Sequence, residues 1–359
     1  MRILIVKLSS IGDVVHALPA AAFLKRALPQ AHISWVVERR ASAILKNSPV
    51  IDQLIEIDTR SWRSGMLKRR TLLEVRARLR DIRRNDAQTD GGVTDVAIDF
   101  QGLVKSGIVA RASGARKRIG FDSADLREKV SRVFLTEQVK TSDLSHVIEK
   151  NLALARAALG NTAALSDSGP YQFPLALAPE DELFAESEAA KSGSRFAILN
   201  PGGGWPTKLW PAVRFGQLAD LLLDQHGLAS IVTYGPGEDC LANQVAASSH
   251  ARAARPLAST LKQFIALARR ASLFVGGDTG PLHLAAASGT PIVGLYGPTS
   301  ADRNGPFDKG DIAVGLDLWC RPNCHQRSCW HWECMDIPLS KVAKAASRRL
   351  AEKEKKEHQ

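Results

Sequence analysis

The sequence predicts an α/β protein built from two doubly wound, parallel-sheet domains. Short, nearly continuous apolar runs rich in Ile, Leu and Val recur along the chain, as expected of parallel strands covered on both faces. Each run is followed by a polar, glycine-bearing loop and then by apolar residues at helical spacing. The 359 residues, 45% of them hydrophobic, are enough for two such domains with a core each.

The first half of the chain predicts a series of strands separated by helical segments. The predicted strands are Arg2–Leu8, Ile33–Val37, Leu54–Ile57, Val96–Phe100 and Lys117–Phe121, and a helix over Leu144–Leu159 follows them. Between the third and fourth strands, apolar residues from Leu72 to Ile82 keep helical spacing among many arginines. This segment is therefore expected to be an amphipathic helix with a basic outer face.

The second half repeats this pattern after a segment rich in Ala, Ser, Pro and Gly. We expect an N-terminal domain over residues 1–175, a linker over 176–194, a C-terminal domain over 195–338 and a final helix and tail over 339–359. The predicted strands are Arg195–Asn200, Ser230–Tyr234, Leu273–Val275 and Ile292–Tyr296, and the predicted helices are Val213–His226 and Leu261–Ala271. The simplest arrangement is two domains facing across a cleft.

The stretch from Leu273 to Pro298 shows the repeated unit most clearly. Its strand ends at two glycines, Thr279 is placed to cap the following helix, and Gly289 closes that helix before the next strand. Such a unit presents backbone N–H groups and a positive helix end to phosphates. Asp278 and His283 flank the helix start, where they could hold a ligand. Alternatively, Asp278 is only a turn residue and His283 a packed helix histidine.

Two further loops follow predicted strands and carry charged residues. Asp13 stands at the start of the helix after the first strand, either as a helix cap or as a carboxylate facing a cleft. The loop PGGGWPTKLWP, residues 201–211, contains three consecutive glycines that allow the backbone to approach a ligand, and Lys208 adds a cation. The alternative is a mobile glycine turn with a surface lysine.

The chain resembles the lipopolysaccharide heptosyltransferases of glycosyltransferase family nine at four motifs in the same order, KLSSIGDVVHALP, DFQGLVKSG, TKLWP and GDTGPLHLAAASGTPIVGLYGPT. It is most similar to the members that add the first heptose to the inner-core sugar 3-deoxy-manno-octulosonic acid (Kdo). The resemblance implies the GT-B fold and an inverting transfer of heptose. It also implies an ADP-heptose donor held by the C-terminal domain and a Kdo-lipid A type acceptor held by the N-terminal domain.

The resemblance also implies roles for individual residues. It makes Asp13 the catalytic base and Lys208 a contact to the donor diphosphate. Donor binding is expected of Gly203, Thr207, Lys208, Glu238, Asp278, Thr279, Gly280 and His283, and acceptor binding of Ser10, Gly12, Arg60, Arg63, Gln101 and Lys105. The family usually has hydroxyl-bearing residues before its lysine, whereas this chain has Gly202 to Gly204.

Charge and composition favour an anionic partner. The formal net charge of +11 suits a phosphorylated substrate, an anionic membrane surface or nucleic acid. Nucleic acid is disfavoured because the basic residues lack interleaved aromatics and no nucleic-acid motif is found. We expect a cytoplasmic enzyme, peripheral to the inner face of the inner membrane, because neither a long apolar run nor a signal-peptide pattern is evident. No cofactor or metal is expected, since Lys208 and backbone N–H groups would neutralise the leaving ADP.

Four cysteines, Cys320, Cys324, Cys329 and Cys334, crowd one short segment. Such clusters can bind zinc or form disulfides, but the spacing does not match paired zinc knuckles and a cytoplasmic location disfavours disulfides. A similar cysteine-rich stretch occurs in part of the family that the chain resembles, so the resemblance implies a structural role, and zinc binding stays an alternative. Two alternatives to first-heptose transfer remain, namely transfer to a later core heptose and a GT-B nucleotide-sugar epimerase that acts on the donor alone.

Overall fold

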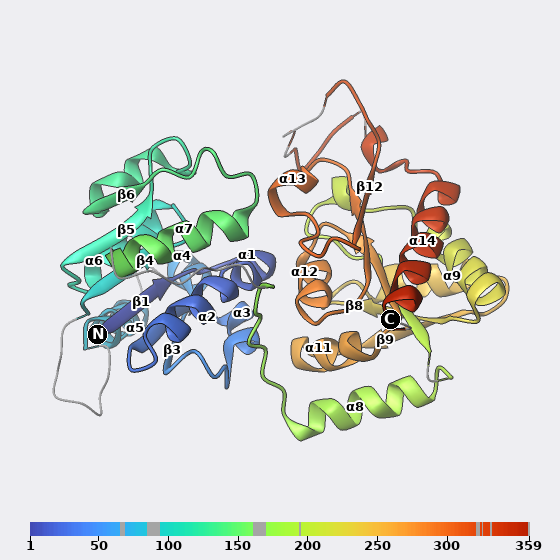
Figure 1. Ribbon diagram of the computed structural model, residues 1–359, viewed down its shortest axis with the longest axis horizontal. Coiled ribbons are helices and arrows are strands. Elements are labelled where there is room, and N and C mark those ends of the chain that lie inside the picture. Colours follow the sequence, from blue (N-terminus) through green and yellow to red (C-terminus); the bar gives the residue numbers. More distant parts are fainter. Residues whose placement is uncertain are drawn as a thin grey trace. The chain divides into compact units, whose positions relative to one another are not determined.

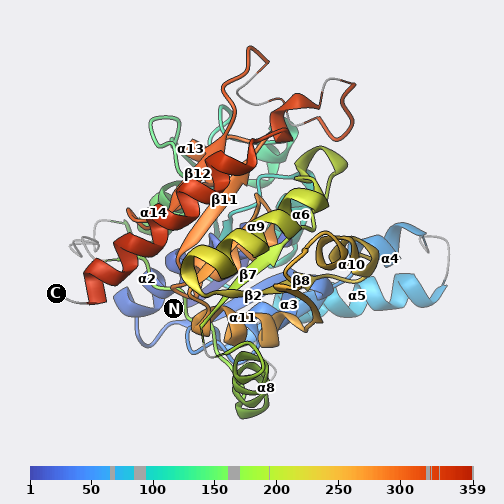
Figure 2. The same ribbon diagram turned by 90° about the vertical axis from the view of Figure 1, so that its right-hand side faces the viewer.

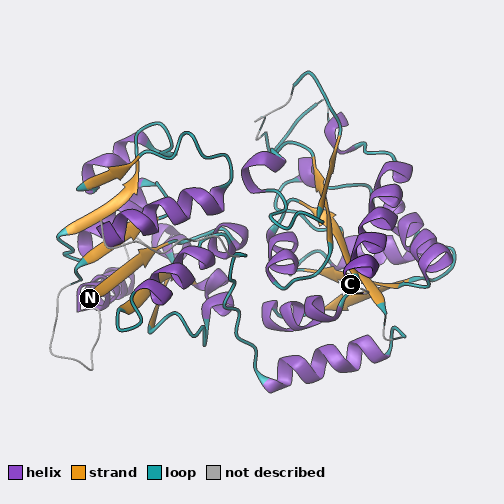
Figure 3. Ribbon diagram, in the orientation of Figure 1, coloured by secondary structure: helices purple, strands orange, loops and turns teal. Residues whose placement is uncertain are grey.

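The computed structural model describes residues 1–64, 69–84, 94–160, 170–193, 195–320, 324, 326–330 and 332–357. The chain forms two compact units, Met1–Ala176 and Leu177–Gln359. Within the described residues each unit contains a six-stranded parallel sheet with helices on both faces (Figures 1 and 3). The predicted doubly wound α/β class is confirmed.

The sheet of the first unit has the strand order β3-β2-β1-β4-β5-β6. Its strands are β1 (Arg2–Val6), β2 (His32–Glu38), β3 (Gln53–Ile57), β4 (Val96–Asp99), β5 (Lys117–Phe121) and β6 (Glu137–Val139). Ile3 lies opposite Ile33 on one side and Val96 on the other, and it is fully buried. The winding direction reverses between β1 and β4, and ligands bind at the carboxyl ends of strands at such a switch point.

The helices of the first unit cover this sheet. They are α1 (Ile11–Val15), α2 (Leu18–Ala27), α3 (Arg39–Leu45), α4 (Thr59–Ser64), α5 (Arg69–Arg84), α6 (Val104–Ala112) and α7 (Val147–Leu159), with the 3₁₀ turn η1 (Lys129–Phe134). Helices α2 and α7 pack together on one face, and α5 and α6 pack together on the other (Figure 1). The predicted basic helix is α5.

The sheet of the second unit has the order β12-β11-β10-β7-β8-β9. Its strands are β7 (Phe196–Asn200), β8 (Ala229–Tyr234), β9 (Ala254–Ala258), β10 (Leu273–Gly277), β11 (Ile292–Tyr296) and β12 (Ile312–Gly315). Its helices are α8 (Pro179–Ala190), α9 (Ala212–His226), α10 (Asp239–Ala247), α11 (Leu261–Arg270), α12 (Gly280–Ala287), α13 (Ala301–Asn304) and α14 (Leu339–Glu357), with the turns η3 (Pro206–Lys208) and η4 (Glu333–Met335). Helices α9 and α14 lie side by side (Figure 2).

The segment expected to be a linker, residues 176–194, contains a helix instead. Helix α8 belongs to the second unit and packs against α11. Pro179 occupies its first turn together with three acidic residues, Glu180 to Glu182, and both features favour a helix start. Near its end, Glu188 binds Arg255 at 2.7 Å. The composition rich in Ala, Ser, Pro and Gly thus does not prevent a helix here, because Pro179 and the acidic residues suit its first turn.

Candidate active site

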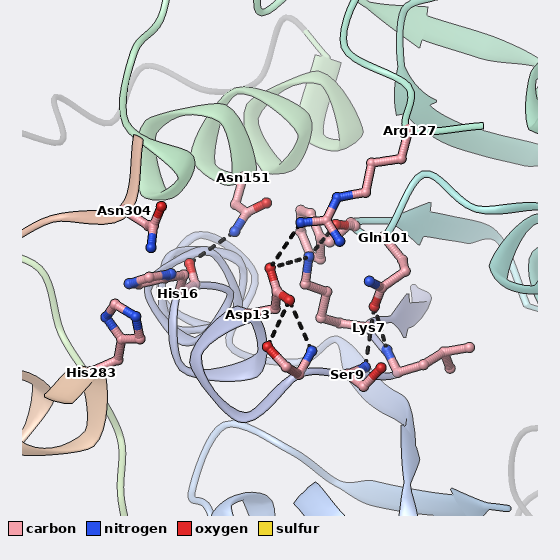
Figure 4. A network of polar contacts seen from close by, with 12 residues as sticks. Lys7, Ser9, Asp13, His16, Gln101, Arg127, Asn151, His283 and Asn304 are labelled. Carbon is pink, nitrogen blue, oxygen red and sulfur yellow. Dashed lines mark hydrogen bonds and ion pairs between the residues drawn. The ribbon is translucent and has the colours of Figure 1, made fainter. Parts of the chain in front are cut away.

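Asp13 lies in the first turn of α1, directly after the central strand β1. The backbone N–H and the hydroxyl of Ser10 both donate to Asp13 Oδ2 at 2.9 Å, so this oxygen caps the helix. The other oxygen, Oδ1, lies 3.8 Å from Lys7 Nζ and 3.8 Å from Arg127 Nη2 (Figure 4). The Asp13 side chain keeps 18% exposure. Capping therefore uses one oxygen and leaves the second beside two cations.

The surroundings of Asp13 keep its carboxyl ionised. Burial raises the pKa of Asp13, but the charges of Lys7 and Arg127 and the hydrogen bonds from Ser10 outweigh it. The net result is a pKa well below the usual range of an aspartate. Asp13 is thus a carboxylate at any physiological pH.

The loop after β4 holds the loop after β1. Lys7 is buried, and its Nζ donates to the Phe100 carbonyl at 2.6 Å. Gln101 Oε1 accepts hydrogen bonds from the N–H groups of Leu8 at 3.1 Å and Ser9 at 3.2 Å (Figure 4). Gln101 is predicted to bind the acceptor, and the structure shows its side-chain carbonyl engaged with the protein backbone.

The other predicted acceptor residues lie in two groups. Ser10 and the buried Gly12 flank the Asp13 turn. Lys105 Nζ lies 3.5 Å from Glu38 Oε1, and Thr59 N–H donates to Glu38 Oε2 at 3.2 Å. Arg60, the next residue on α4, is exposed. The side chain of Arg63, also on α4, lies outside the described residues, so its predicted role stays untested.

In the second unit, Lys208 and Asp278 meet at the carboxyl end of the sheet. Lys208 Nζ lies 2.8 Å from Asp278 Oδ2 and donates to the Asp278 carbonyl at 2.7 Å. It also lies 4.7 Å from the ring centroid of Trp205. Asp278 Oδ1 accepts from Asn304 Nδ2 at 2.6 Å and lies 3.0 Å from His283 Nε2. Elements far apart in sequence thus converge on one buried carboxylate.

The Asp278 carboxyl is held as an anion. Burial raises its pKa, but the hydrogen bond and charge of His283 and the charge of Lys208 outweigh this effect. The pKa of Asp278 lies well below the usual range. Because the side chain is only 4% exposed, Asp278 acts inside the protein, where it orients Lys208 and His283.

The start of α12 has no side-chain cap among the described residues. Thr279 precedes the helix as predicted, but its side chain makes no capping hydrogen bond among the described residues, and its Oγ1 is buried without a partner there. The expected side-chain cap is therefore wrong, because the hydroxyl does not reach the first-turn N–H groups. Those groups and the helix dipole favour a negative ligand. At the other end, Gly289 adopts φ +81°, as a closing glycine should.

Glu238 connects the two glycine loops of the second unit. Its Oε1 accepts from Gly203 N–H at 3.2 Å, and its Oε2 accepts from Gly235 N–H at 2.9 Å. A Cβ built at Gly202 would overlap the Glu238 carboxylate, so a side chain there would require this carboxylate to move. Thr207, another predicted donor residue, is buried and donates from Oγ1 to the Gln326 carbonyl at 2.8 Å.

The four clustered cysteines line one cavity of the second unit. Thr207 and Gly297 also line it, and all five cysteines of the chain, each within the described part, are free thiols. Burial raises the pKa of Cys334, and the neighbouring Cys320, Cys324 and Cys329 raise it further. Among the described residues, no three His, Cys, Asp or Glu side chains are placed to hold a metal ion.

Comparison with known proteins assigns the chain to a family. The family model for glycosyltransferase family 9 (heptosyltransferase) matches residues 89–331. The chain belongs to glycosyltransferase family 9. It is an enzyme of the heptosyltransferase group, with the GT-B fold that its motifs predict.

Relatives and a solved structure agree with this assignment. The chain is 28% identical over 332 residues to lipopolysaccharide heptosyltransferase 1 of Pseudomonas aeruginosa. The aligned region covers 92% of this chain and 87% of that relative. The chain is 28% identical over 313 residues to the protein of the same name from Escherichia coli, covering 87% and 92%. The structure of E. coli heptosyltransferase WaaC with ADP-2-deoxy-2-fluoro heptose matches with a TM-score of 0.74 at 25% identity, covering 98% of this chain and all of that one.

Proposed function

We propose that this family 9 glycosyltransferase transfers heptose, with inversion, from ADP-heptose to the Kdo of a lipopolysaccharide inner core. The observation that carries the proposal is the uncapped start of α12 beside the Lys208–Asp278 pair, which suits the diphosphate of a nucleotide sugar. The curated relatives named lipopolysaccharide heptosyltransferase 1 and the structure with an ADP-heptose analogue support this donor and this acceptor class.

On this proposal the second unit binds the donor. When the bond between the sugar and ADP breaks, the diphosphate gains negative charge. The Lys208 ammonium and the N–H groups at the start of α12 would stabilise that charge more in the transition state than in the ground state. Gly203, Thr207 and Glu238 would shape the glycine loops around the nucleotide, and Thr279, Gly280 and His283 would line the phosphate end. No metal or other cofactor is needed for this neutralisation.

The first unit would bind the acceptor and supply the base. The acceptor oxygen forms a bond to the anomeric carbon, the bond from that carbon to the ADP oxygen breaks, and the hydroxyl proton passes to Asp13. A carboxylate with a lowered pKa is a weak base towards a free alcohol. The hydroxyl becomes acidic only as its oxygen bonds to the cationic carbon, so the proton leaves late, and the negative charge of Asp13 favours that cation throughout.

The acceptor is expected to be anionic and anchored in a membrane. Arg60, Arg63 and Lys105 are the candidate contacts to its carboxylates and phosphates, and α5 carries further cations, among them the exposed Arg76 and Arg80. No helix of the described residues has the length and apolar character to cross a bilayer. We therefore propose peripheral attachment of the enzyme at the cytoplasmic face of the inner membrane, through anionic lipid and not through nucleic acid.

Three incubations test the proposed reaction. The purified protein is given ADP-heptose or other ADP-sugars with a lipid acceptor that ends in Kdo, with an acceptor that already carries the first heptose, or with no acceptor, each with and without EDTA. Heptose transfer to the Kdo-terminated acceptor, undiminished by EDTA, is expected. Transfer only to the heptosylated acceptor would indicate a later core position, and conversion of ADP-heptose without acceptor would indicate an epimerase.

Membrane attachment has its own test. Sedimentation with vesicles containing anionic phospholipid, compared with neutral vesicles at the same low salt concentration, should recover more protein with the anionic vesicles. The double variant Arg76→Glu, Arg80→Glu should reduce this difference. Equal recovery with both kinds of vesicle would remove anionic lipid from the proposed partners.

A further inference from the structure

We propose that Gln101 is a positioning residue, which fixes the loop that carries the catalytic base instead of touching the substrate. Gln101 is only 5% exposed and follows β4, the strand next to β1 at the switch point of the first unit. Its side chain reaches from the β4 loop to the β1 loop (Figure 4). The kinetic part of the argument rests on the function proposed above.

Gln101 is itself firmly held. Asp99, which is 1% exposed, accepts the N–H of Gln101 at 2.9 Å and the N–H of Gly102 at 3.2 Å on Oδ1. Its Oδ2 accepts the Ser106 hydroxyl at 2.9 Å. One buried carboxylate therefore organises the turn between β4 and α6, so the Gln101 side chain starts from a fixed backbone.

The Gln101 side chain takes the place of a strand carbonyl. Phe100 N–H donates to the Val6 carbonyl at 3.1 Å, which is the last backbone contact of this kind between the two segments in the described part. Beyond it, Gln101 Oε1 accepts both the Leu8 and the Ser9 N–H groups. The side chain thus extends the pairing of the two segments past the end of the sheet, where the backbone would otherwise diverge.

The residues on either side of Leu8 and Ser9 contact the two carboxylate oxygens of Asp13. Ser10, the next residue, holds Oδ2 through its N–H and hydroxyl. Lys7, which lies 3.8 Å from Oδ1, is itself tied to the Phe100 carbonyl. Two of the three groups beside the carboxylate are thus tied to the β4 loop, Lys7 directly and Ser10 through its neighbour Ser9. A shift of this loop would misplace the base, and a misplacement of about 1 Å can lower a rate about 100-fold.

Two substitutions separate positioning from acceptor binding. Gln101→Glu keeps an oxygen acceptor for the Leu8 and Ser9 N–H groups and removes the amide N–H group that a sugar would accept from. Gln101→Leu keeps the approximate size and removes the acceptor oxygen. If Gln101 positions the loop, the Leu variant loses both the protection of the Leu8 and Ser9 amides and catalytic activity, and the Glu variant keeps both. If Gln101 binds the acceptor through its amide, both variants fail in the same way.

The experiment measures hydrogen exchange of the Leu8 and Ser9 amides, together with kcat and the KM values for donor and acceptor. We expect Gln101→Leu to exchange faster at these amides and to lose about 10- to 100-fold in kcat, with both KM values within about threefold of wild type. Gln101→Glu should stay close to wild type in both measurements. If the Leu variant does not fold, Gln101→Asn replaces it. Its side chain is shorter by one methylene, so its carbonyl oxygen lies farther from the Leu8 and Ser9 N–H groups.

Each other outcome overturns the proposal. Unchanged exchange in Gln101→Leu would show that the hydrogen bonds do not hold the loop. Faster exchange with unchanged kcat would show that the loop does not position the base. A rise in acceptor KM common to both variants would return Gln101 to acceptor binding. If wild type transfers no heptose, the proposed function fails, whereas the exchange measurement still decides whether Gln101 holds the loop.

Discussion

The two units share one topology and use its switch point differently. Read in chain order, the strands of the second unit have the same arrangement as those of the first, with the first and fourth strands side by side in the middle of the sheet. Each unit places a lysine and an aspartate at this point. In the first unit the pair is Lys7 and Asp13, 3.8 Å apart, and in the second it is Lys208 and Asp278, 2.8 Å apart.

The difference lies in which partner is exposed. In the first unit the lysine side chain is 4% exposed and the aspartate 18%. In the second unit the order is reversed, with the lysine 14% and the aspartate 4% exposed. The same pair thus presents an accessible carboxylate in one unit, as a base requires, and an accessible ammonium in the other, as a diphosphate requires. The buried partner in each case sets the position and charge of the accessible one.

The largest expected effect is the loss of the accessible carboxylate. Asp13→Ala should lower kcat about 10²- to 10⁴-fold, the range for a lost general base, because the proton and the cationic carbon lose their anion. The variant should remain folded by circular dichroism, since a lost helix cap costs only about 1 kcal/mol. Turnover within twofold of wild type would end the role of Asp13.

The second-largest effect is expected from the loss of the accessible Lys208 ammonium. Lys208→Met should lower kcat/KM about 10²- to 10³-fold in steady-state assays, because a preorganised cation facing the leaving diphosphate is lost. Arg327→Met is the matched control, since the Arg327 guanidinium also lies over Trp205, with 5.4 Å from its Cζ to the ring centroid. Equal losses in the two variants would indicate that the charge near Trp205 matters and not the pairing of Lys208 with Asp278.

The buried carboxylates give opposite pH effects. Burial raises the pKa of Asp99 to about 6, so the folded state binds this proton more tightly than the unfolded chain. Its stabilising effect is complete below pH about 4 and is lost as the pH rises through about 6, a decrease of roughly 3 kcal/mol in the free energy of unfolding. Asp13 and Asp278 have lowered pKa values, so their contribution is present above pH about 4 and is lost only in stronger acid.

Urea unfolding between about pH 4 and pH 7, which spans the unfolded and folded pKa values of Asp99, covers most of this decrease. Asp99→Asn should flatten the decrease in stability across the window. The matched change is Asp311→Asn, at an aspartate of the second unit whose pKa burial also raises to about 6. It should remove a separate part of the pH-dependent decrease in the free energy of unfolding. An unchanged slope in Asp99→Asn would show that Asp99 titrates normally.

A smaller effect is expected at the glycine loop of the donor unit. Gly202→Ala places a Cβ against the Glu238 carboxylate and should break its hydrogen bonds to Gly203 and Gly235. We expect the KM for the donor to rise about tenfold, equivalent to about 1.4 kcal/mol. Gly204→Ala, where a Cβ meets nothing within 4 Å, should change it less than about twofold. Similar values for the two variants would contradict this role of Glu238.

The smallest effect is expected at the cysteine cavity. Because Cys334 is a free thiol whose pKa is raised by burial, it should be protonated at neutral pH and react slowly with iodoacetamide, whereas the exposed Cys240 should react first. Peptide mass spectrometry after timed alkylation measures the order. Metal analysis of protein purified without chelator checks the thiols independently, and a zinc content near one per chain would contradict the free-thiol arrangement.

The inner strands could be predicted from sequence, whereas of the four edge strands only β3, predicted as Leu54–Ile57, was found. The predicted strands Ile33–Val37 and Ile292–Tyr296 correspond to β2 and β11, because strands covered on both faces have apolar runs in their sequences. The strands that were missed, β6, β9 and β12, each lie at the edge of a sheet. They are short or carry charged residues and proline, as in the ARPLA sequence of β9, so the apolar signal is weak.

The site was predictable where the partners are close in sequence. Asp278 and His283 lie five residues apart, and the Gly-rich turn with its helix start predicts their neighbourhood. Arg127 and Asn304 were missed, because each lies far along the chain from the aspartate it contacts and the fold alone brings them together. The burial of the Asp99 carboxylate could not be predicted either, because whether a charge at a strand end is buried depends on how the surrounding elements pack.

The pairing of Lys208 with Asp278 has a consequence for selectivity among ligands. The ammonium already has a counter-ion before any ligand arrives, so an incoming anion gains only the difference between its own attraction and that of the aspartate. A singly charged competitor such as acetate gains little by this exchange. A diphosphate carries more charge and would also engage the start of α12, so abundant small anions would not displace a nucleotide sugar from Lys208.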